Sequence, residues 1–325
     1  MHCARTMLAS IFFGLVILPA FWMDAAAQTW PQRTVRFVTP LGPGSGVDIA
    51  ARLVADKLAK RWDQAVVVEN RPGGDAIVAI TAFVNARDDH FLLFSPSSSF
   101  TAHPFTQSSL PYQPADLAPI AKVSNTVIAV TVNSAMPANN FNELIELIRS
   151  QPGKYNWAGI TGAFDFVFES FLKTAGLEMT KVPYRNPVEA ANDLAEGRVH
   201  VYRSALAIAQ PQLQAGKIKL LAIANTKRAP AVPNIQTVGE AGHPAMAMDG
   251  LIGLFAPPSM PMALRERIAA DVKAVLQDDP AIAERLERTG QIVDPDGPAE
   301  FGREIEQQRE RVGLAARVIG LKPKQ

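Results

Sequence analysis

The sequence has a single cysteine, Cys3, among its 325 residues. Cys3 precedes an apolar N-terminal segment that we expect to be removed, so the mature chain has no thiol for a disulfide or a thiolate metal site. A chain exported without disulfides has to be stabilised by its apolar core, and residues 28–325 are long enough to bury one. That length suits one large domain or two of medium size.

The chain also has almost no net charge. It contains 32 basic and 31 acidic residues, which gives a formal net charge of +1. Because the sequence has no basic stripe, we expect no nucleic-acid or membrane-surface partner. Charged residues make up 19% of the sequence and hydrophobic residues 48%, a composition typical of a compact protein. We expect a monomer.

Motifs of the common enzyme classes are missing. The segment Gly42–Gly46 lacks the G-x-G-x-x-G spacing, no P-loop lysine follows it, and the sequence has no G-x-S-x-G or H-E-x-x-H. Ser170 and Lys173 match S-x-x-K without its companion motifs, which we attribute to chance. His200 has no carboxylate or second histidine at metal-ligand spacing. We therefore expect no catalytic residue, no metal and no cofactor.

The N-terminus has the pattern of a secretory signal peptide. Arg5 follows the amino end, Leu8–Met23 is almost wholly apolar, and Ala25–Ala27 supplies a small-residue cleavage pattern. The apolar run is short for a membrane-spanning helix. We expect residues 1–27 to be a signal peptide that is cut after its last residue, which places the mature chain in the periplasm. An uncleaved membrane anchor is the alternative.

The segment Val35–Arg61 organises the rest of the chain. A β-branched and aromatic run at 34–39 predicts a buried strand, the glycines and prolines of 40–46 predict a loop, and Ile49, Leu53, Val54 and Leu58 repeat at helical spacing. A strand, a glycine loop and a helix form a device that holds anions, because the first N–H groups of the helix have no partner within it.

A second copy of this device is predicted at Lys154–Gly176. It has a short strand at 155–157, a loop at 158–162 and an apolar helical face that ends at Gly176. Two such devices more than one hundred residues apart suggest a single ligand that is bound from two sides. The alternative is that both are ordinary turns between a strand and a helix.

Strands and helices alternate along the remaining chain, which predicts an α/β fold with mainly parallel sheets. A polar loop at 95–101 should lie on the same rim as the first glycine loop, because ligands bind at the carboxyl ends of parallel strands. Strands at 127–132 and 251–256 should cross between two lobes, one formed by residues 28–128 plus 252–325 and the other by 129–251. Other strands are expected at 65–68, 91–94, 179–182, 199–202 and 219–224, and helices at 77–84, 140–148, 187–196, 206–213, 261–276, 281–288 and 298–312.

Two segments carry a resemblance to a known family. Val66–Gly74 reads VVVENRPGG, and Pro230–Gly242 reads PAVPNIQTVGEAG. With these in order, the chain from Trp30 to its C-terminus resembles the tripartite tricarboxylate transporter receptors, the Bug-type extracytoplasmic solute-binding proteins. The resemblance implies a two-lobed periplasmic "Venus flytrap" that closes on a small, usually carboxylate-bearing solute and delivers it to a membrane permease. The alternatives are a solute sensor that docks on a signalling ectodomain, and an exported α/β enzyme.

The resemblance also implies ligand-binding positions. They lie in the first glycine loop, in the polar loop, in the second device and after a later strand: Leu41, Gly44, Ser45, Gly46 and Asp48; Ser98 and Thr101; Thr161, Gly162, Ala163 and Asp165; and Arg203. The family usually has hydroxyls where this chain has Asp165, and often an acid where it has Arg203. Asp165 either faces the ligand or complements the helix dipole, and Arg203 is either a surface charge or a residue of the cleft.

These two departures suggest a linked reversal of charge. In one hypothesis Arg203 pairs with Asp165; in the other, Arg203 receives the carboxylate of the solute while Asp165 meets an amine, amide or hydroxyl. Both predict weak binding of dicarboxylates and tricarboxylates such as citrate, and tighter binding after Asp165→Ser, because like charges repel.

Overall fold

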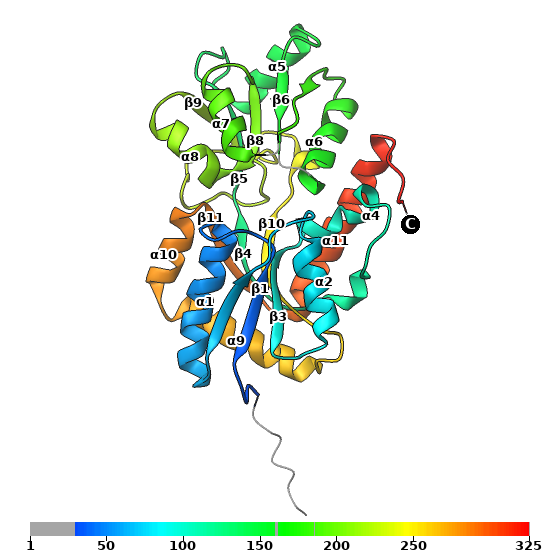
Figure 1. Cartoon of the computed structure of the whole chain (residues 1–325). Helices are drawn as coiled ribbons and strands as arrows, with labels where there is room; N and C mark the ends of the chain where they lie inside the picture. The colour runs from blue at the N-terminus through cyan, green and yellow to red at the C-terminus, as the bar shows by residue number, and fades with distance from the viewer. Residues whose placement is uncertain (1–29, 160–161, 185, 325) are drawn as a thin grey trace, which may run out of the picture.

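The computed structural model describes residues 30–159, 162–184 and 186–324, so the predicted signal peptide lies outside the described residues. Two β-sheets lie one above the other, each flanked by helices (Figure 1). The first has the strand order β11-β4-β10-β3-β1-β2 and the second β7-β6-β8-β5-β9. The strands of the first sheet are β1 Val35–Thr39, β2 Val66–Asn70, β3 Phe91–Pro96, β4 Ala118–Thr126, β10 Gly250–Ala256 and β11 Gln291–Asp296. Those of the second are β5 Ile128–Asn133, β6 Asn156–Ala158, β7 Thr180–Lys181, β8 Val201–Ala205 and β9 Ile218–Ile223.

Helices cover the sheets in the order that the apolar periodicity predicts. Around the first sheet they are α1 Gly46–Trp62, α2 Ile77–Ala86, α3 Ser98–Thr101, α4 His103–Thr106, η1 Pro114–Asp116, α9 Met262–Gln277, α10 Pro280–Arg288 and α11 Pro298–Val318. Around the second they are α5 Phe141–Ser150, α6 Ala163–Thr174, α7 Pro187–Ala195, α8 Leu206–Gln214 and η2 Pro244–Met246.

Helix α5 illustrates how local sequence produces these elements. Asn140 caps the helix, and its side chain accepts a hydrogen bond from the Glu143 amide. The Glu143 carboxylate in turn accepts one from the Asn139 amide at 2.7 Å, which satisfies a second N–H group near the helix start. Leu144 and Ile148 are buried on the inner face, so the cap and the apolar spacing agree on one helix.

Both sheets are mixed, so the prediction of mainly parallel sheets is wrong. Strand β1 is parallel to β2 and β3, but β10 is antiparallel to β3 and β4, and β11 is antiparallel to β4. In the second sheet β6 is parallel to β7 and β8, whereas β5 is antiparallel to β8 and β9. The crossing strands cause this mixture, because each enters its sheet from the other one. The predicted α/β architecture with two crossing strands is confirmed.

Three local predictions also need correction. The polar loop expected at 95–101 forms the end of β3 and the short helix α3 instead, and α4 follows it. Strands β4 and β11 were not predicted, because β4 buries Lys122, Ser124 and Asn125 and therefore shows no alternation of polar and apolar residues. Strand β8 begins later than expected and includes Arg203.

The C-terminal helix α11 contacts strand β4 of the first sheet and helix α6 of the second half. Phe301 and Ile305 pack in a core beneath the first sheet, while Val312 and Ala316 share a core with Phe168 of α6. Figure 1 shows α11 extending upward beside α6. The helix is therefore a third connection between the two halves of the molecule. The lobe boundaries given above stay a prediction.

No helix among the described residues combines the length and the apolar character needed to cross a bilayer.

Lys122 holds three elements of the first sheet together. Its side chain is buried in β4, and its Nζ lies 3.0 Å from Asp294, 2.7 Å from Asp296 and 2.6 Å from Glu304. Burial alone would lower the pKa of Lys122, but hydrogen bonds to these carboxylates raise it. The lysine therefore stays charged and joins β4 to β11 and α11.

We predict that Lys122→Met lowers the free energy of unfolding by about 3 kcal/mol, because it leaves the three carboxylates without their counter-ion. Lys227→Met is the matched control. The Lys227 Nζ lies 3.6 Å from Asp294 and its side chain is 71% exposed, so we expect a change within about 0.5 kcal/mol. Urea denaturation of both variants measures the difference, and equal losses would contradict the prediction.

Candidate functional site

The first glycine loop is held from within by Asp48. The Asp48 carboxylate accepts hydrogen bonds from the Gly44 amide at 2.9 Å, from Arg52 Nε at 3.1 Å and from Asn70 Nδ2 at 2.7 Å. Although burial acts to raise the pKa of Asp48, the hydrogen bonds from Arg52, Asn70 and Gly44 lower it. Ser45 Oγ accepts from the Asp48 amide at 3.2 Å and caps α1. Both side chains therefore shape the loop.

Two amide groups at the start of α1 remain available. Neither Gly46 N nor Val47 N donates a hydrogen bond to any described residue. The Gly46 carbonyl accepts from Gln291 Nε2 at 2.8 Å, which fixes the loop on β11. Gly44 has a φ of +82°, a conformation that favours glycine. Leu41 is 37% exposed. Free amides at a helix N-terminus form an anion-binding site.

The hydroxyl groups that follow β3 differ in their surroundings: some make buried hydrogen bonds, and others are partly exposed. Thr101 is buried, and its Oγ1 donates to Gln308 Oε1 at 3.3 Å; Ser97 Oγ donates to the same oxygen at 2.6 Å. Gln308 Nε2 donates to the Asp249 carbonyl at 2.9 Å. Thr101 therefore ties α3 to α11 and to the start of β10, whereas Ser98 is half-buried. The sequence did not indicate the role of Gln308.

The second device touches the first half of the molecule. Thr161 lies outside the described residues. Gly162 has a φ of +85°, and a Cβ there would lie 3.5 Å from the Cβ of Ala102, so the start of α6 rests against the start of α4. Ala163 is buried behind it, and the rings of Phe105 and Phe166 meet edge to face with centroids 6.2 Å apart. This contact places the loop before α6 next to the short helices that follow β3, on one side of the interface between the sheets.

Asp165 pairs with Lys181, so the hypothesis that it pairs with Arg203 is wrong. The Lys181 Nζ lies 2.7 Å from Asp165 Oδ2, and the carboxylate is 1% exposed. A side chain at Gly159 would collide with this carboxylate. Neither carboxylate oxygen accepts a well-directed hydrogen bond among the described residues, so the contact is an ion pair and not a bidentate bridge.

Arg203 is a buried cation in strand β8, opposite Val130. Its Nη1 donates to the Phe164 carbonyl at 2.5 Å, and its guanidinium lies over the Phe168 ring, 5.2 Å from the centroid. Its Nε and Nη2 have no hydrogen-bond partner among the described residues. Burial lowers the pKa of Arg203 to about 10, with Asp165 acting in the opposite direction, so the group is charged at neutral pH. Arg203 is not a surface charge.

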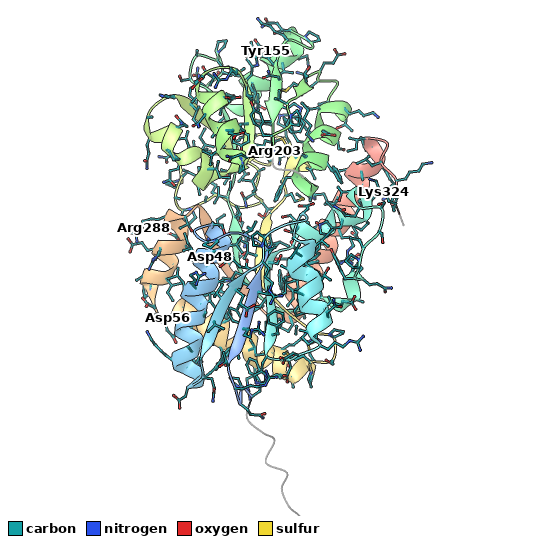
Figure 2. All side chains as sticks on the ribbon, in the orientation of Figure 1. Asp48, Asp56, Tyr155, Arg203, Arg288 and Lys324 are labelled. Atoms are coloured by element: carbon teal, nitrogen blue, oxygen red, sulfur yellow. The ribbon has the colours of Figure 1, made fainter. Side chains whose placement is uncertain are left out.

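Buried polar atoms without partners gather where the two sheets face each other. They include Thr39 Oγ1 at the end of β1, Asn125 Oδ1 near the end of β4 and Ser204 Oγ near the end of β8. Asp48 lies at the end of α1 that faces the second sheet, and Arg203 at the end of the second sheet that faces the first (Figure 2). The sequence prediction missed Thr39, Asn125 and Ser204. Thr39 ends a largely apolar strand at the edge where ligands bind, which is a usable signal. Asn125 lies in the unpredicted strand β4, and Ser204 lies beyond the predicted strand 199–202.

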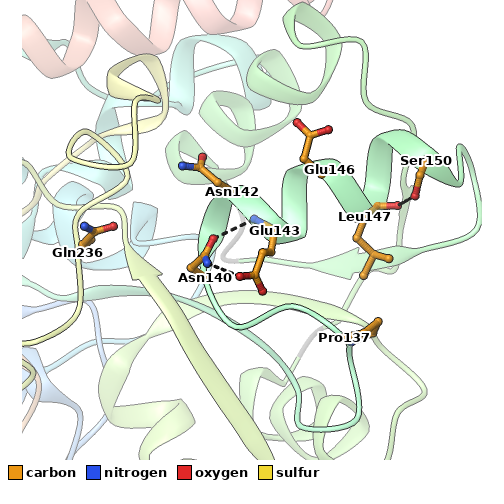
Figure 3. A pocket seen from close by; sticks show the side chains of 8 residues that line it. All are labelled: Pro137, Asn140, Asn142, Glu143, Glu146, Leu147, Ser150 and Gln236. Carbon is orange, nitrogen blue, oxygen red and sulfur yellow. Dashed lines mark hydrogen bonds between the residues drawn. The ribbon is translucent and has the colours of Figure 1, made fainter.

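One surface hollow and two acidic clusters among the described residues lack these features. A surface hollow of about 940 Å³ lies beside α5, on the far side of the second sheet (Figure 3). Its residues Asn140 and Glu143 already bind each other as the helix cap. Two acidic clusters have the spacing of metal ligands, Asp88–His90 and Asp294, Asp296, Glu304. Each already holds a cation, Arg33 in the first and Lys122 in the second.

Two sheets joined by crossing strands, with polar groups at their facing ends, define a periplasmic solute-binding protein. Rpa4515 of R. palustris, solved with adipate, has 26% sequence identity and a TM-score of 0.77, covering 90% of this chain and 99% of that chain. MatC of Rhodopseudomonas palustris, solved with bound malate, has 26% identity and a TM-score of 0.70, covering 89% and 100%. BugD has 25% identity and a TM-score of 0.69, covering 88% and 99%.

The chain belongs to the tripartite tricarboxylate transporter receptor family, whose model matches residues 50–320. A UPF0065 protein of Bordetella pertussis is 32% identical over 305 residues, covering 92% of this chain and 94% of that protein. BugT of the same species is 27% identical over 237 residues, covering 71% and 73%. The family is one of periplasmic solute-binding receptors. The resemblance seen in the sequence and the two-lobed fold that it implied are confirmed.

The environment of Asp165 makes folding depend on pH. Burial raises the pKa of Asp165 from its ordinary value of 3.8 to about 6, against the opposing effects of Lys181 and Arg203, and Glu169 adds to the rise. An acid with a higher pKa in the folded state favours folding at low pH, and this contribution is lost as the pH rises through about 4 to 6.

We predict that the wild type loses up to ~3 kcal/mol relative to Asp165→Asn between pH 4 and pH 7, at about 1.4 kcal/mol for each unit of pKa shift. Urea denaturation of both proteins at the two pH values measures this difference, because the other titrating groups contribute equally. Parallel pH profiles would show that the Asp165 pKa is not raised in the folded state.

Proposed function

We propose that this chain is a periplasmic receptor that captures a small carboxylate-bearing solute between two lobes, residues 28–128 plus 252–325 and residues 129–251. The single observation that carries the proposal is the pairing of two anion-binding groups across the interface. The start of α1 offers the free amides of Gly46 and Val47, and the second sheet offers the unpartnered donors of Arg203. A solute between them would be held from both sides.

The proposed ligand class agrees with what similar proteins hold. The R. palustris protein with adipate and MatC with malate contain dicarboxylic acids. A carboxylate accepts hydrogen bonds from helix-terminal amides and from a guanidinium in the same way, with two oxygens and a full negative charge. We therefore infer that the solute is an organic acid. The family description supports delivery to a tripartite tricarboxylate-type permease, and the signal-peptide pattern supports a periplasmic location.

Capture follows from the two-lobed geometry. Only a closed form contacts the solute from both lobes, so binding shifts the equilibrium toward closure. A solute of micromolar affinity supplies about 8 kcal/mol, part of which is used to order the lobes. The closed form then presents a surface that the permease can distinguish from the open one.

The ion pair between Asp165 and Lys181 changes which solutes we expect to bind. The sequence predicts weak binding of dicarboxylates, because the Asp165 carboxylate would repel a second acid. Since Lys181 lies 2.7 Å from that carboxylate, its charge is compensated, and we now expect dicarboxylates to be accepted.

Isothermal calorimetry with adipate, malate, citrate and the neutral analogue adipamide tests the proposal. We expect at least one of the acids to bind with micromolar affinity and adipamide not to bind, because an amide carries no charge for the α1 amides or for Arg203. Equal binding of adipate and adipamide, or no binding of any acid, would contradict the proposed ligand class.

A glycine pair separates the role of the first loop from general stability. Gly44 and Gly242 have φ of +82° and +91°, and a Cβ at either would meet nothing within 4 Å. Each Gly→Ala change should therefore destabilise the fold by a similar ~1 kcal/mol through backbone strain. We predict that only Gly44→Ala weakens acid binding, by about tenfold, since it distorts the loop that presents the α1 amides. Equal affinities of the two variants would contradict a ligand role for the loop.

A further inference from the structure

We propose that Lys181 sets the charge selectivity of the second lobe: by holding Asp165 in an ion pair, it leaves the buried Arg203 guanidinium free to bind the acidic group of the solute. This inference rests on the proposed function and assigns a specificity-determining role to Arg203 and a positioning role to Lys181. Lys181 itself stands at the edge of the second sheet, in strand β7.

The contacts of Lys181 and Arg203 differ in kind. Asp165 has both cations in its surroundings, with Glu169 as a second carboxylate nearby. Only Lys181 is at ion-pair distance, 2.7 Å, and no carboxylate pairs with Arg203 within the described part of the chain. A buried ion without a counter-ion is strongly disfavoured. Both carboxylates, Asp165 and Glu169, are at ion-pair distance from Lys181, which leaves the Nε and Nη2 donors of Arg203 without an acceptor among the described residues.

The Lys181 ammonium is held in place by three contacts. Its Nζ is 2.7 Å from Glu169 as well as from Asp165, and it lies over the Trp157 ring at 5.1 Å from the centroid. Two carboxylates and an aromatic face hold a lysine whose side chain is 40% exposed. This arrangement fixes the ammonium beside Asp165, because each contact favours the charged form in the same place.

The unused donors of the Arg203 guanidinium point in one direction. The guanidinium is located at the first turn of α6 by its bond to the Phe164 carbonyl and by the Phe168 ring beneath it. Its Nε and Nη2 are unused, and these two nitrogens lie on one side of the planar fork, where they match the two oxygens of a carboxylate. The partial positive charge of the α6 N-terminus acts in the same direction. An acid bound here would satisfy both donors at once.

If Arg203 had only a structural role, its substitution would have a different effect on stability and selectivity. If the bond to Phe164 and the contact with Phe168 were its whole role, Arg203→Met would destabilise the protein without solute and leave the choice of solute unchanged. On our proposal, Arg203→Met removes two buried donors that have no partner. The Tm in the absence of solute should therefore not fall, because replacing a buried charge by an apolar side chain is often neutral or stabilising. The selectivity for a second acidic group should be lost instead.

The experiment compares a dicarboxylate with a monocarboxylate of the same chain length. Calorimetry with succinate and butyrate, and with adipate and hexanoate, is run at pH 8.5, where Asp165 remains ionised. Lys181→Met should weaken binding of the dicarboxylates by tenfold or more, because Asp165 then turns to Arg203, and should change binding of the monocarboxylates by less than threefold. Lys173→Met removes the same charge from exposed α6 surface and should alter every affinity by less than twofold.

Two further variants complete the test. Arg203→Met should abolish the same discrimination, and adding Lys181→Met to it should cause no additional loss, since both changes act through one guanidinium. Asp165→Asn in the Lys181→Met background should restore dicarboxylate binding to within threefold of the wild type. Unchanged dicarboxylate binding in Arg203→Met or in Lys181→Met would overturn the inference and leave the proposed function standing. Failure of every acid to bind the wild type would overturn both.

Discussion

The fold depends on the backbone at Val127, the one residue between β4 and β5. Its amide donates to the Gly290 carbonyl at 2.8 Å, and its own carbonyl accepts from the Leu206 amide at 2.9 Å. Asn225 secures the flanking residues, because its Oδ1 accepts from the Ile128 amide and its Nδ2 donates to the Thr126 carbonyl. This crossing between the sheets is thus fully hydrogen-bonded backbone, and any movement between them has to be accommodated here, at the second crossing that leads into β10, and at α11.

Two buried cations on either side of this junction differ in how completely the protein supplies their hydrogen-bond acceptors. Lys122 lies just before it in β4 and has three carboxylates within 3.0 Å. Arg203 lies beyond it in β8, opposite Val130 of β5, and contacts one carbonyl oxygen and an aromatic ring. The hydrogen bonds of Lys122 are satisfied within the protein, whereas buried donors of Arg203 without acceptors are costly. On the proposed function, the acid of the bound solute supplies the missing acceptors.

The sequence was sufficient for what depends on neighbouring residues. The period of apolar residues located α1 and α6, and the glycine loops before them were predicted for the same reason. It was insufficient for tertiary pairs. Nothing near Asp165 in sequence indicates that Lys181, from another element, reaches it, so the only protein partner that the sequence suggests for Asp165, in one of two hypotheses, is Arg203. Strand β4 was missed because tertiary contacts with β11 and α11 allow it to bury Lys122, against the usual preference of charged residues for the surface.

The two halves of the candidate site therefore differ in what they can select. The first loop offers backbone amides. These can donate hydrogen bonds to the carboxylate of almost any organic acid and distinguish little beyond its charge. Its one acidic side chain, Asp48, is occupied by Gly44, Arg52 and Asn70 and is not available to the solute. On the proposed function, discrimination between acids rests on the second sheet, where Arg203 stands at a position at which the resemblance implies an acid in many relatives. Because a guanidinium without a counter-ion penalises solutes that lack a second acid, selectivity here would arise as much from rejection of the wrong solute as from attraction of the right one.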